Sequence, residues 1–130
     1  MEVSTVLHHK YFNGVVNDPV AERYQKKALK YFNTFGLFGT GLFGMIKSPK
    51  GYNWQNLDLM ANWARKNSVT LHFNTVITGR LKAYPEWFQK LPSKDKLCIL
   101  LDHVEKVVGR CKEDFKYYKL VNESLGEEGE

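Results

Sequence analysis

The sequence predicts an α/β fold in which a parallel sheet is built from strands that alternate with helices. Short runs rich in β-branched and aromatic residues alternate along the chain with longer segments whose apolar residues recur at helical spacing. The strand-like runs are nearly continuous in apolar residues, which is typical of parallel strands buried on both faces. Composition agrees, because 130 residues with 43% hydrophobic and 25% charged residues suit one domain with one core.

Seven elements are predicted, in the order strand, helix, strand, helix, strand, helix, strand. A helical crossover between successive strands makes them parallel neighbours in one sheet. The strands are expected at residues 11–16, in the first half of 34–45 with a loop after it, at 69–77 and at 115–121. The helices are expected at 20–32, at 55–67 and from 93 to about 111.

Capping and breaking signals set the helix boundaries. Asp18 is a candidate N-cap, because its side chain can accept from a free backbone N–H of the first turn, and Pro19 suits the first helical position. Pro49 and Gly51 indicate a turn at residues 47–52. Ser93 is expected to cap the longest helix, whose apolar residues follow a 3.6-residue period: Leu97, Leu100, Leu101, Val104, Val107, Val108 and Cys111.

Four parallel strands with three intervening helices make a partial (β/α)8 TIM barrel, about half of a fold that needs roughly 250 residues. The alternative is a complete four-stranded α/β domain. The length of the chain favours this alternative, because a half-barrel would leave two strand edges unpaired. In a half-barrel those edges would favour self-association. The inner sheet face would lack its opposite wall, and it is expected to carry Phe35, Leu37, Leu71, Phe73 and Leu120. No linker divides residues 1–130, so one domain is expected.

Charge and residue spacing exclude several classes of function. The formal charge is +5, but the basic residues are scattered from Lys10 to Lys119, whereas a nucleic-acid surface needs them clustered on one face. No apolar run is long enough for a membrane span, and no signal peptide is visible, although the compartment stays open. The four histidines and two cysteines show no metal-ligand spacing, so no metal or cofactor is expected.

The two cysteines, Cys98 and Cys111, fall in the longest predicted helix. A rise of 1.5 Å per residue separates them by about 20 Å, which exceeds the roughly 7 Å limit for a disulfide. Both are therefore expected to be free thiols, and both are expected to face the core.

The most informative residues, Asn122 and Glu123, stand at the end of the last predicted strand. In a barrel of alternating strands and helices, the carboxyl ends of the strands form the active-site face. A carboxylic acid there can protonate a leaving sugar oxygen, and a neighbouring amide can hold a sugar hydroxyl. An Asn-Glu pair at a strand end is also common turn chemistry, so the pair alone leaves both interpretations open.

Three stretches carry a family resemblance. They are Gly51-Tyr52-Asn53-Trp54 with the helix ending in Lys66-Asn67, the strand containing His72 with Pro85-Glu86-Trp87 after it, and the helix containing His103 that leads to Val121-Asn122-Glu123. In this order and at this spacing, they resemble glycoside hydrolase family 10, the endo-β-1,4-xylanase family, over nearly the whole chain.

The resemblance implies a (β/α)8 barrel and a retaining glycosidase with two glutamates. The family's acid/base glutamate maps onto Glu123, and the preceding asparagine, which contacts the sugar at the cleavage site, maps onto Asn122. The strand-three histidine that contacts the same sugar maps onto His72. The nucleophilic glutamate belongs to strand seven, which this chain does not contain, so the fragment alone is expected to be inactive. Family members are commonly secreted.

The chain departs from the family pattern in three places. The sugar-binding lysine of strand two maps onto Phe43, the Trp-His of strand three onto Val76-Ile77, and the Trp-Asp before the glutamate onto Tyr118-Lys119. These departures affect the expected glycan specificity more than the expected fold. The expected partners are a β-glycan or xylo-oligosaccharide and the remaining half of the barrel.

Structural interpretations stand beside the functional ones. His103 and the three tryptophans are expected to be packing residues, with Trp87 the best candidate for a sugar platform. The alternative function is a non-catalytic carbohydrate-binding or interaction module, in which Asn122 and Glu123 only hold a ligand or a turn.

Overall fold

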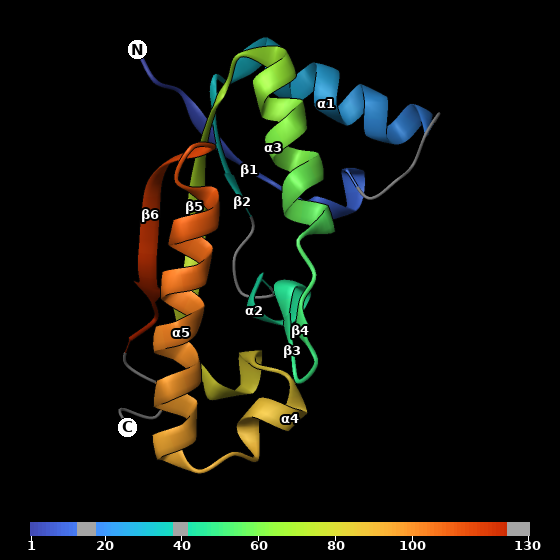
Figure 1. Ribbon diagram of the computed structural model, residues 1–130. Coiled ribbons are helices and arrows are strands. Elements are labelled where there is room, and N and C mark those ends of the chain that lie inside the picture. The colour runs from blue at the N-terminus through green and yellow to red at the C-terminus, as the bar shows by residue number, and fades with distance from the viewer. Residues whose placement is uncertain (13–17, 38–41, 125–130) are drawn as a thin grey trace.

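The computed structural model describes residues 1–12, 18–37 and 42–124. Its main sheet has four parallel strands in the order β1-β2-β5-β6. These strands are β1 (Ser4–Leu7), β2 (Thr34–Leu37), β5 (Thr70–Thr78) and β6 (Phe115–Asn122). The long helices between them are α1 (Pro19–Tyr31), α3 (Gln55–Asn67) and α5 (Ser93–Cys111) (Figure 1). The structure thus confirms the predicted partial (β/α)8 arrangement.

Short elements fill the connections. They are η1 (His9–Tyr11), α2 (Leu42–Ile46), the antiparallel pair β3 (Lys47–Ser48) and β4 (Gly51–Tyr52), η2 (Leu81–Ala83) and α4 (Glu86–Gln89). The predicted turn at 47–52 is therefore a small hairpin, and the loop predicted before it contains the short helix α2. No helix among the described residues is long and apolar enough to span a membrane.

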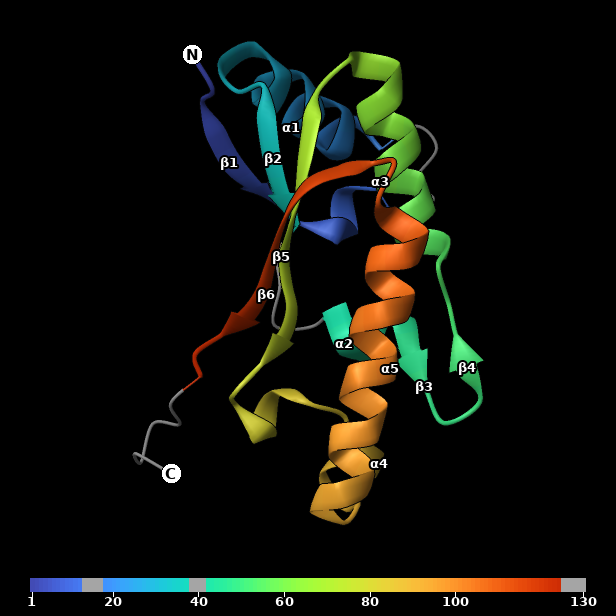
Figure 2. The ribbon, with the colours of Figure 1, turned by 60° about the vertical axis from the view of Figure 1, so that its left-hand side comes forward.

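The long helices lie on one side of the sheet, and the other side is open (Figure 2). Phe35, Leu37, Leu71 and Phe73 are at most 1% exposed and belong to the core beneath the helices. The prediction that they face the barrel interior was wrong, because the core forms where the helices cover the sheet. Leu120, the fifth residue of that prediction, is 47% exposed.

The first strand lies earlier than predicted. It is formed by Ser4–Leu7, whereas residue 11 ends η1 and residues 13–16 of the predicted strand lie outside the described residues. Tyr11 stacks on Tyr24 with ring centroids 4.1 Å apart, so this aromatic residue packs against α1 instead of joining the sheet. The run of Thr5 and Val6, both β-branched, supplies the strand.

Local signals at the helix ends were largely confirmed. The carboxylate of Asp18 accepts from the Val20 backbone N–H at 2.8 Å, and Pro19 begins α1. Ser93 begins α5 but makes no capping hydrogen bond, and Pro92 holds the N-cap position. Cys111 is buried as predicted, but Cys98 is exposed. Thirteen helical residues rotate the side chain by about 220°, so the two thiols point to different sides.

Candidate active site

The carboxyl ends of β5 and β6 meet at one end of the sheet. Thr78 and Asn122, the last residues of the two strands, are direct neighbours in the parallel register. Strand β6 runs toward the lower part of Figure 1, and Glu123 follows it at once in the sequence. We call Gly79, Arg80, Lys119, Asn122 and Glu123 the strand-end site.

The turn after β5 is held by Tyr84, which is 5% exposed. Its hydroxyl donates to the Thr78 carbonyl at 2.8 Å and accepts from the Thr78 backbone N–H at 2.9 Å. Burial raises the pKa of Tyr84, and the hydrogen bond to the Thr78 backbone partly offsets the rise. The hydroxyl therefore remains a neutral donor that fixes where the chain leaves the sheet.

Gly79 joins this turn to the end of β6. Its backbone N–H donates to the Asn122 carbonyl at 2.9 Å. A Cβ atom at this position would collide with the backbone carbonyl of Glu123. Only glycine therefore allows the two strand ends to come this close.

The backbone of Glu123 is in the left-handed region, with φ of 49°. Its side chain is 42% exposed, and one carboxylate oxygen lies 3.6 Å from Nε of Arg80. A half-exposed carboxylate with one cationic neighbour is open to a ligand and is also held in place. The structure thus places the predicted acid/base residue at the predicted face of the sheet.

Asn122 is half-buried beside it. The ammonium of Lys119, three residues earlier on β6, donates to the amide oxygen Oδ1 of Asn122. Neither Lys119 nor Arg80 was predicted as a site residue. The Arg80 contact depends on how β5 and β6 are paired, for which the sequence carries no local signal. Lys119 and Asn122 are three residues apart on β6, a spacing that places side chains on opposite faces of a regular strand.

His72 lies apart from Asn122 and Glu123. It pairs with Tyr117 in the β5–β6 register, whereas Asn122 pairs with Thr78. Five to six residues along the strands therefore separate His72 from Asn122. This corresponds to about 15–20 Å at roughly 3.3 Å per residue. Strands β5 and β6 are adjacent and parallel as predicted, but the expected convergence of His72 with Glu123 on one sugar ring is not found.

The surroundings of His72 explain this position. The imidazole covers Gly36 on the open side of the sheet, where a Cβ atom at that glycine would collide with the ring. Partial burial lowers the pKa of His72. A shallow cavity of about 460 Å³ lies here, lined by Glu2, Ser4, Thr34, His72, Tyr117, Tyr118 and Lys119.

The position of the family's strand-two lysine is occupied by a core residue. Phe43 is 3% exposed and packs against Tyr84 and Phe88 with ring centroids 4.9 and 5.0 Å away. Trp87 stacks on the same ring at 6.0 Å, so it belongs to this aromatic cluster and is not a free sugar platform. The cluster supports the Tyr84 hydroxyl and, through it, the strand-end site.

His103 also belongs to the packing around Phe43. It is fully buried, its Nδ1 lies 3.3 Å from the Tyr52 hydroxyl, and its Nε2 has no partner of hydrogen-bonding geometry among the described residues. Burial lowers the pKa of His103 to about 4; the Val76 backbone and Asp102 raise it less, while Lys47 lowers it further. A neutral buried imidazole is a structural group, as predicted.

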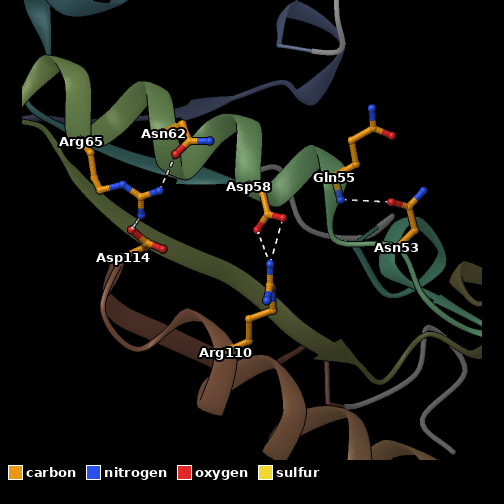
Figure 3. Close-up of polar contacts among 7 residues, drawn as sticks. All are labelled: Asn53, Gln55, Asp58, Asn62, Arg65, Arg110 and Asp114. Carbon is orange, nitrogen blue, oxygen red and sulfur yellow. Dashed lines mark hydrogen bonds and ion pairs between the residues drawn. The ribbon is translucent and has the colours of Figure 1, made fainter.

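A polar network on the outer side ties α3 to α5 (Figure 3). Arg110 donates to both carboxylate oxygens of Asp58 at 2.8 and 2.9 Å, and Arg65 pairs with Asp114 and Asn62. The Arg110 guanidinium also lies 5.2 Å from the centre of the Trp54 ring. This network fastens two helices and lies on the side of the sheet opposite the open face.

The part of the chain that the structure describes contains no set of side chains that could bind a metal ion. No group of three or more His, Cys, Asp or Glu side chains gathers there. The chemistry of the strand-end site is that of one carboxylate, one amide and two cations.

Comparison with known proteins identifies the family. The model for glycosyl hydrolase family 10 matches residues 5–130. The chain belongs to glycosyl hydrolase family 10. Endo-1,4-beta-xylanase 3 of Hypocrea jecorina is 31% identical over 78 residues, which are 59% of this chain and 22% of that protein. Endo-1,4-beta-xylanase B of Thermotoga neapolitana is 27% identical over 114 residues, which are 85% of this chain and 32% of that protein.

A solved family member shows the same fold. Xylanase 10B from Thermotoga petrophila RKU-1, solved in complex with xylobiose, matches with a TM-score of 0.78 at 20% identity. The match covers 97% of this chain and 38% of that one. This family 10 chain therefore spans between about a fifth and two fifths of the length of these relatives.

Proposed function

We propose that this chain carries the acid/base side of a retaining family 10 glycoside hydrolase that acts on β-1,4-linked xylan. One observation carries the proposal: a half-exposed carboxylate, Glu123, lies beside an amide at the carboxyl end of the last strand. Two relatives are named as endo-1,4-beta-xylanases, and the similar solved xylanase holds xylobiose. These names support xylan or a xylo-oligosaccharide as the substrate.

In this proposal Glu123 acts twice. As an acid it protonates the glycosidic oxygen while the bond to the sugar breaks, and as a base it later takes a proton from the attacking water. Asn122 binds a hydroxyl of the sugar at the cleavage site. The nucleophilic carboxylate must lie about 5–5.5 Å from the acid/base carboxylate, and we place it in a part of the whole protein that this chain lacks.

The role of His72 stays a prediction from the resemblance. Its level on β5 argues against a shared sugar ring with Glu123, because the register separates the two by several residues. Its place over Gly36 suits packing in the interior of a closed barrel.

A chimera tests the proposal. Residues 1–124 would be joined to the remaining part of the Thermotoga petrophila xylanase, and hydrolysis of an aryl β-xylobioside would be measured. We expect turnover in the chimera, and a loss of roughly 10²–10⁴-fold in Glu123→Gln, the usual worth of general acid/base catalysis. Glu113→Gln is the matched control, because Glu113 is exposed just before the opposite end of β6.

Two results would contradict the proposal. One is a chimera in which Glu123→Gln and Glu113→Gln retain equal activity. The other is turnover by the 130-residue chain alone that disappears in Glu123→Gln, since the nucleophile would then lie within this chain or a second copy of it.

The single domain is proposed to be the N-terminal half of the barrel, completed by further strand–helix units. Among the described residues, β1 and β6 are the sheet edges. On β6, Tyr117, Leu120 and Val121 are each 46–47% exposed, and Val6 on β1 is 41% exposed. Such edges favour pairing with another strand.

Sedimentation of the isolated chain checks this edge proposal. We expect self-association that rises with concentration and weakens in Leu120→Lys, because a lysine on an edge opposes strand pairing. Lys112→Glu, an exposed change at the end of α5, is the control for altered charge. A stable monomer at high concentration would favour a complete small domain.

A non-catalytic carbohydrate-binding module is the second candidate. The ion pair with Arg80 favours it, because that pair engages one oxygen of the Glu123 carboxylate. In this case, Glu123→Gln would weaken binding of xylotetraose, and the chimera would have no turnover.

A further inference from the structure

We propose that Lys119 is a positioning residue that turns the Asn122 side chain into a hydrogen-bond donor toward its ligand. The primary amide of asparagine has one oxygen that accepts and one NH₂ group that donates. The Lys119 ammonium donates to that oxygen. The NH₂ group is then the part of Asn122 left to face a ligand, and the side chain is fixed against the flip that would exchange oxygen and nitrogen.

The backbone on which Lys119 stands is itself fixed. The Thr75 hydroxyl, in a residue only 3% exposed, donates to the Lys119 carbonyl at 2.6 Å. Thr75 lies where the register of β5 against β6 shifts, between Asn74 and Ile77. The hydroxyl therefore holds β6 across an irregular part of the sheet.

The backbone of Asn122 is fixed as well, by the Gly79 N–H that donates to its carbonyl at 2.9 Å. Both ends of the Lys119–Asn122 contact are thus anchored to β5. The fixed backbones remove main-chain motion from the cost of forming this contact, so the remaining cost is the rotamer freedom of the two side chains.

The second cation of the site has a different partner. Arg80 lies 3.6 Å from the Glu123 carboxylate, so each of the two polar residues has its own basic neighbour.

The proposal specifies which ligand groups the Asn122 side chain can bind. A donor NH₂ group binds the lone pairs of a sugar hydroxyl or ring oxygen. It rests on the proposed function for the identity of the ligand, but the orientation of the amide is a property of the free protein. The two can therefore be tested separately.

Nuclear magnetic resonance of the free 130-residue chain tests the orientation. The readouts are the Asn122 side-chain carbonyl carbon shift and the mobility of its NH₂ group, assigned with Asn122→Asp. We expect a deshielded carbonyl carbon and a rigid NH₂ group in the wild type. Lys119→Met should shift the carbon toward the value of a free asparagine and make the NH₂ group mobile, and Lys119→Arg should restore both.

The controls separate positioning from folding. Lys116→Met removes the lysine at the opposite end of β6, which forms an ion pair with Glu2 at 3.1 Å. This variant should leave the Asn122 signals unchanged. Backbone signals of β5 and β6 report whether Lys119→Met folds, and Lys119→Gln provides a second variant. Unchanged Asn122 signals in folded Lys119→Met and folded Lys119→Gln would overturn the proposal.

Addition of xylotetraose then tests the ligand. Wild type and Lys119→Arg should show shifts of the Asn122 NH₂ signals that saturate, and Lys119→Met should need a several-fold higher sugar concentration. If the Lys119 effect on free Asn122 is present but no variant responds to the sugar even within the chimera, the positioning role stands and the proposed xylan function fails.

Discussion

The two sides of the four-stranded sheet differ in how completely they are packed. On the helix side, Phe35 and Phe73 are fully buried beneath α3 and α5. On the open side, Tyr117, which lines the cavity beside His72, is 47% exposed. On the last strand, Leu120 and Val121 also remain nearly half exposed. The helix side therefore supplies most of the stability of this chain, whereas residues of the open side and of β6 are available for partners and chemistry.

The largest expected effect compares a core residue with an edge residue. Phe73→Ala should reduce the free energy of unfolding by about 3–5 kcal/mol, because it opens a cavity in a closed core. Leu120→Ala should cost about 1 kcal/mol or less, because the side chain is 47% exposed. Urea unfolding measures both. Equal losses would mean that Leu120 is buried in solution and that the sheet is not open there.

The next effect compares the two histidines on opposite sides of the sheet. Burial lowers the pKa of His103 from 6.5 to about 4. Between these values the unfolded chain binds a proton that the folded protein does not, so stability falls as pH falls. The loss across this window is roughly 3 kcal/mol.

Unfolding measured from pH 7 to pH 4 checks this behaviour. The acid-side loss should be much smaller in His103→Phe, which cannot take up the proton. His72→Phe should leave most of the loss in place, because His72 is only partly buried. A His103→Phe variant with the wild-type pH dependence would rule out His103 as the source.

Two glycines allow a sharper comparison of the strand-end site with a helix surface. Gly79→Ala should destabilise the protein by about 1–3 kcal/mol, because the new Cβ atom meets the Glu123 carbonyl. Gly109→Ala on α5 meets no atom within 4 Å and should stabilise it by about 0.5–1 kcal/mol. Thermal unfolding of both variants gives the signs, and a neutral Gly79→Ala would mean that the two strand ends separate easily.

The smallest effect concerns the ion pair between α3 and α5. Asp58 and Arg110 are each nearly half exposed, so their pair should contribute about 0.3–1 kcal/mol despite its two hydrogen bonds. A double-mutant cycle with Asp58→Asn and Arg110→Met measures the pairwise energy. It should decrease with added salt, and a coupling above about 2 kcal/mol would show that the pair is desolvated in solution.

The sequence predicted the elements whose signals are local. Helix periodicity located α5, and Asp18 with Pro19 located the start of α1. The first strand was misplaced because the aromatic residues at 11 and 12 have strand propensity but pack against α1 and Trp63. Propensity was overridden there by tertiary contacts.

The strand-end site was predicted in part for a similar reason. Asn122 and Glu123 were found because they follow a strand directly. The level of His72 depends on the register between β5 and β6, which shifts twice within these strands, and no pattern along a single chain reveals such shifts. Arg80 was missed because its partner, Glu123, is set by that same pairing of the two strands. Lys119 was missed because side chains three residues apart in a regular strand point to opposite faces.

The order of strands in the sheet has a consequence for how the chain folds. Within the main sheet, β2, β5 and β6 each pair with the previous strand of that sheet, so the sheet can grow by adding one unit at a time. The pairings join residues 30, 36 and 44 positions apart, namely Ser4 with Thr34, Thr34 with Thr70 and Leu71 with Phe115. Parallel pairing over such separations slows folding, but its order suits a polypeptide that leaves the ribosome with its N-terminus first. Pulsed hydrogen exchange during refolding should show amides of β2 protected before those of β6. The residues of the strand-end site would then be the last to take their places, after the scaffold that holds them already exists.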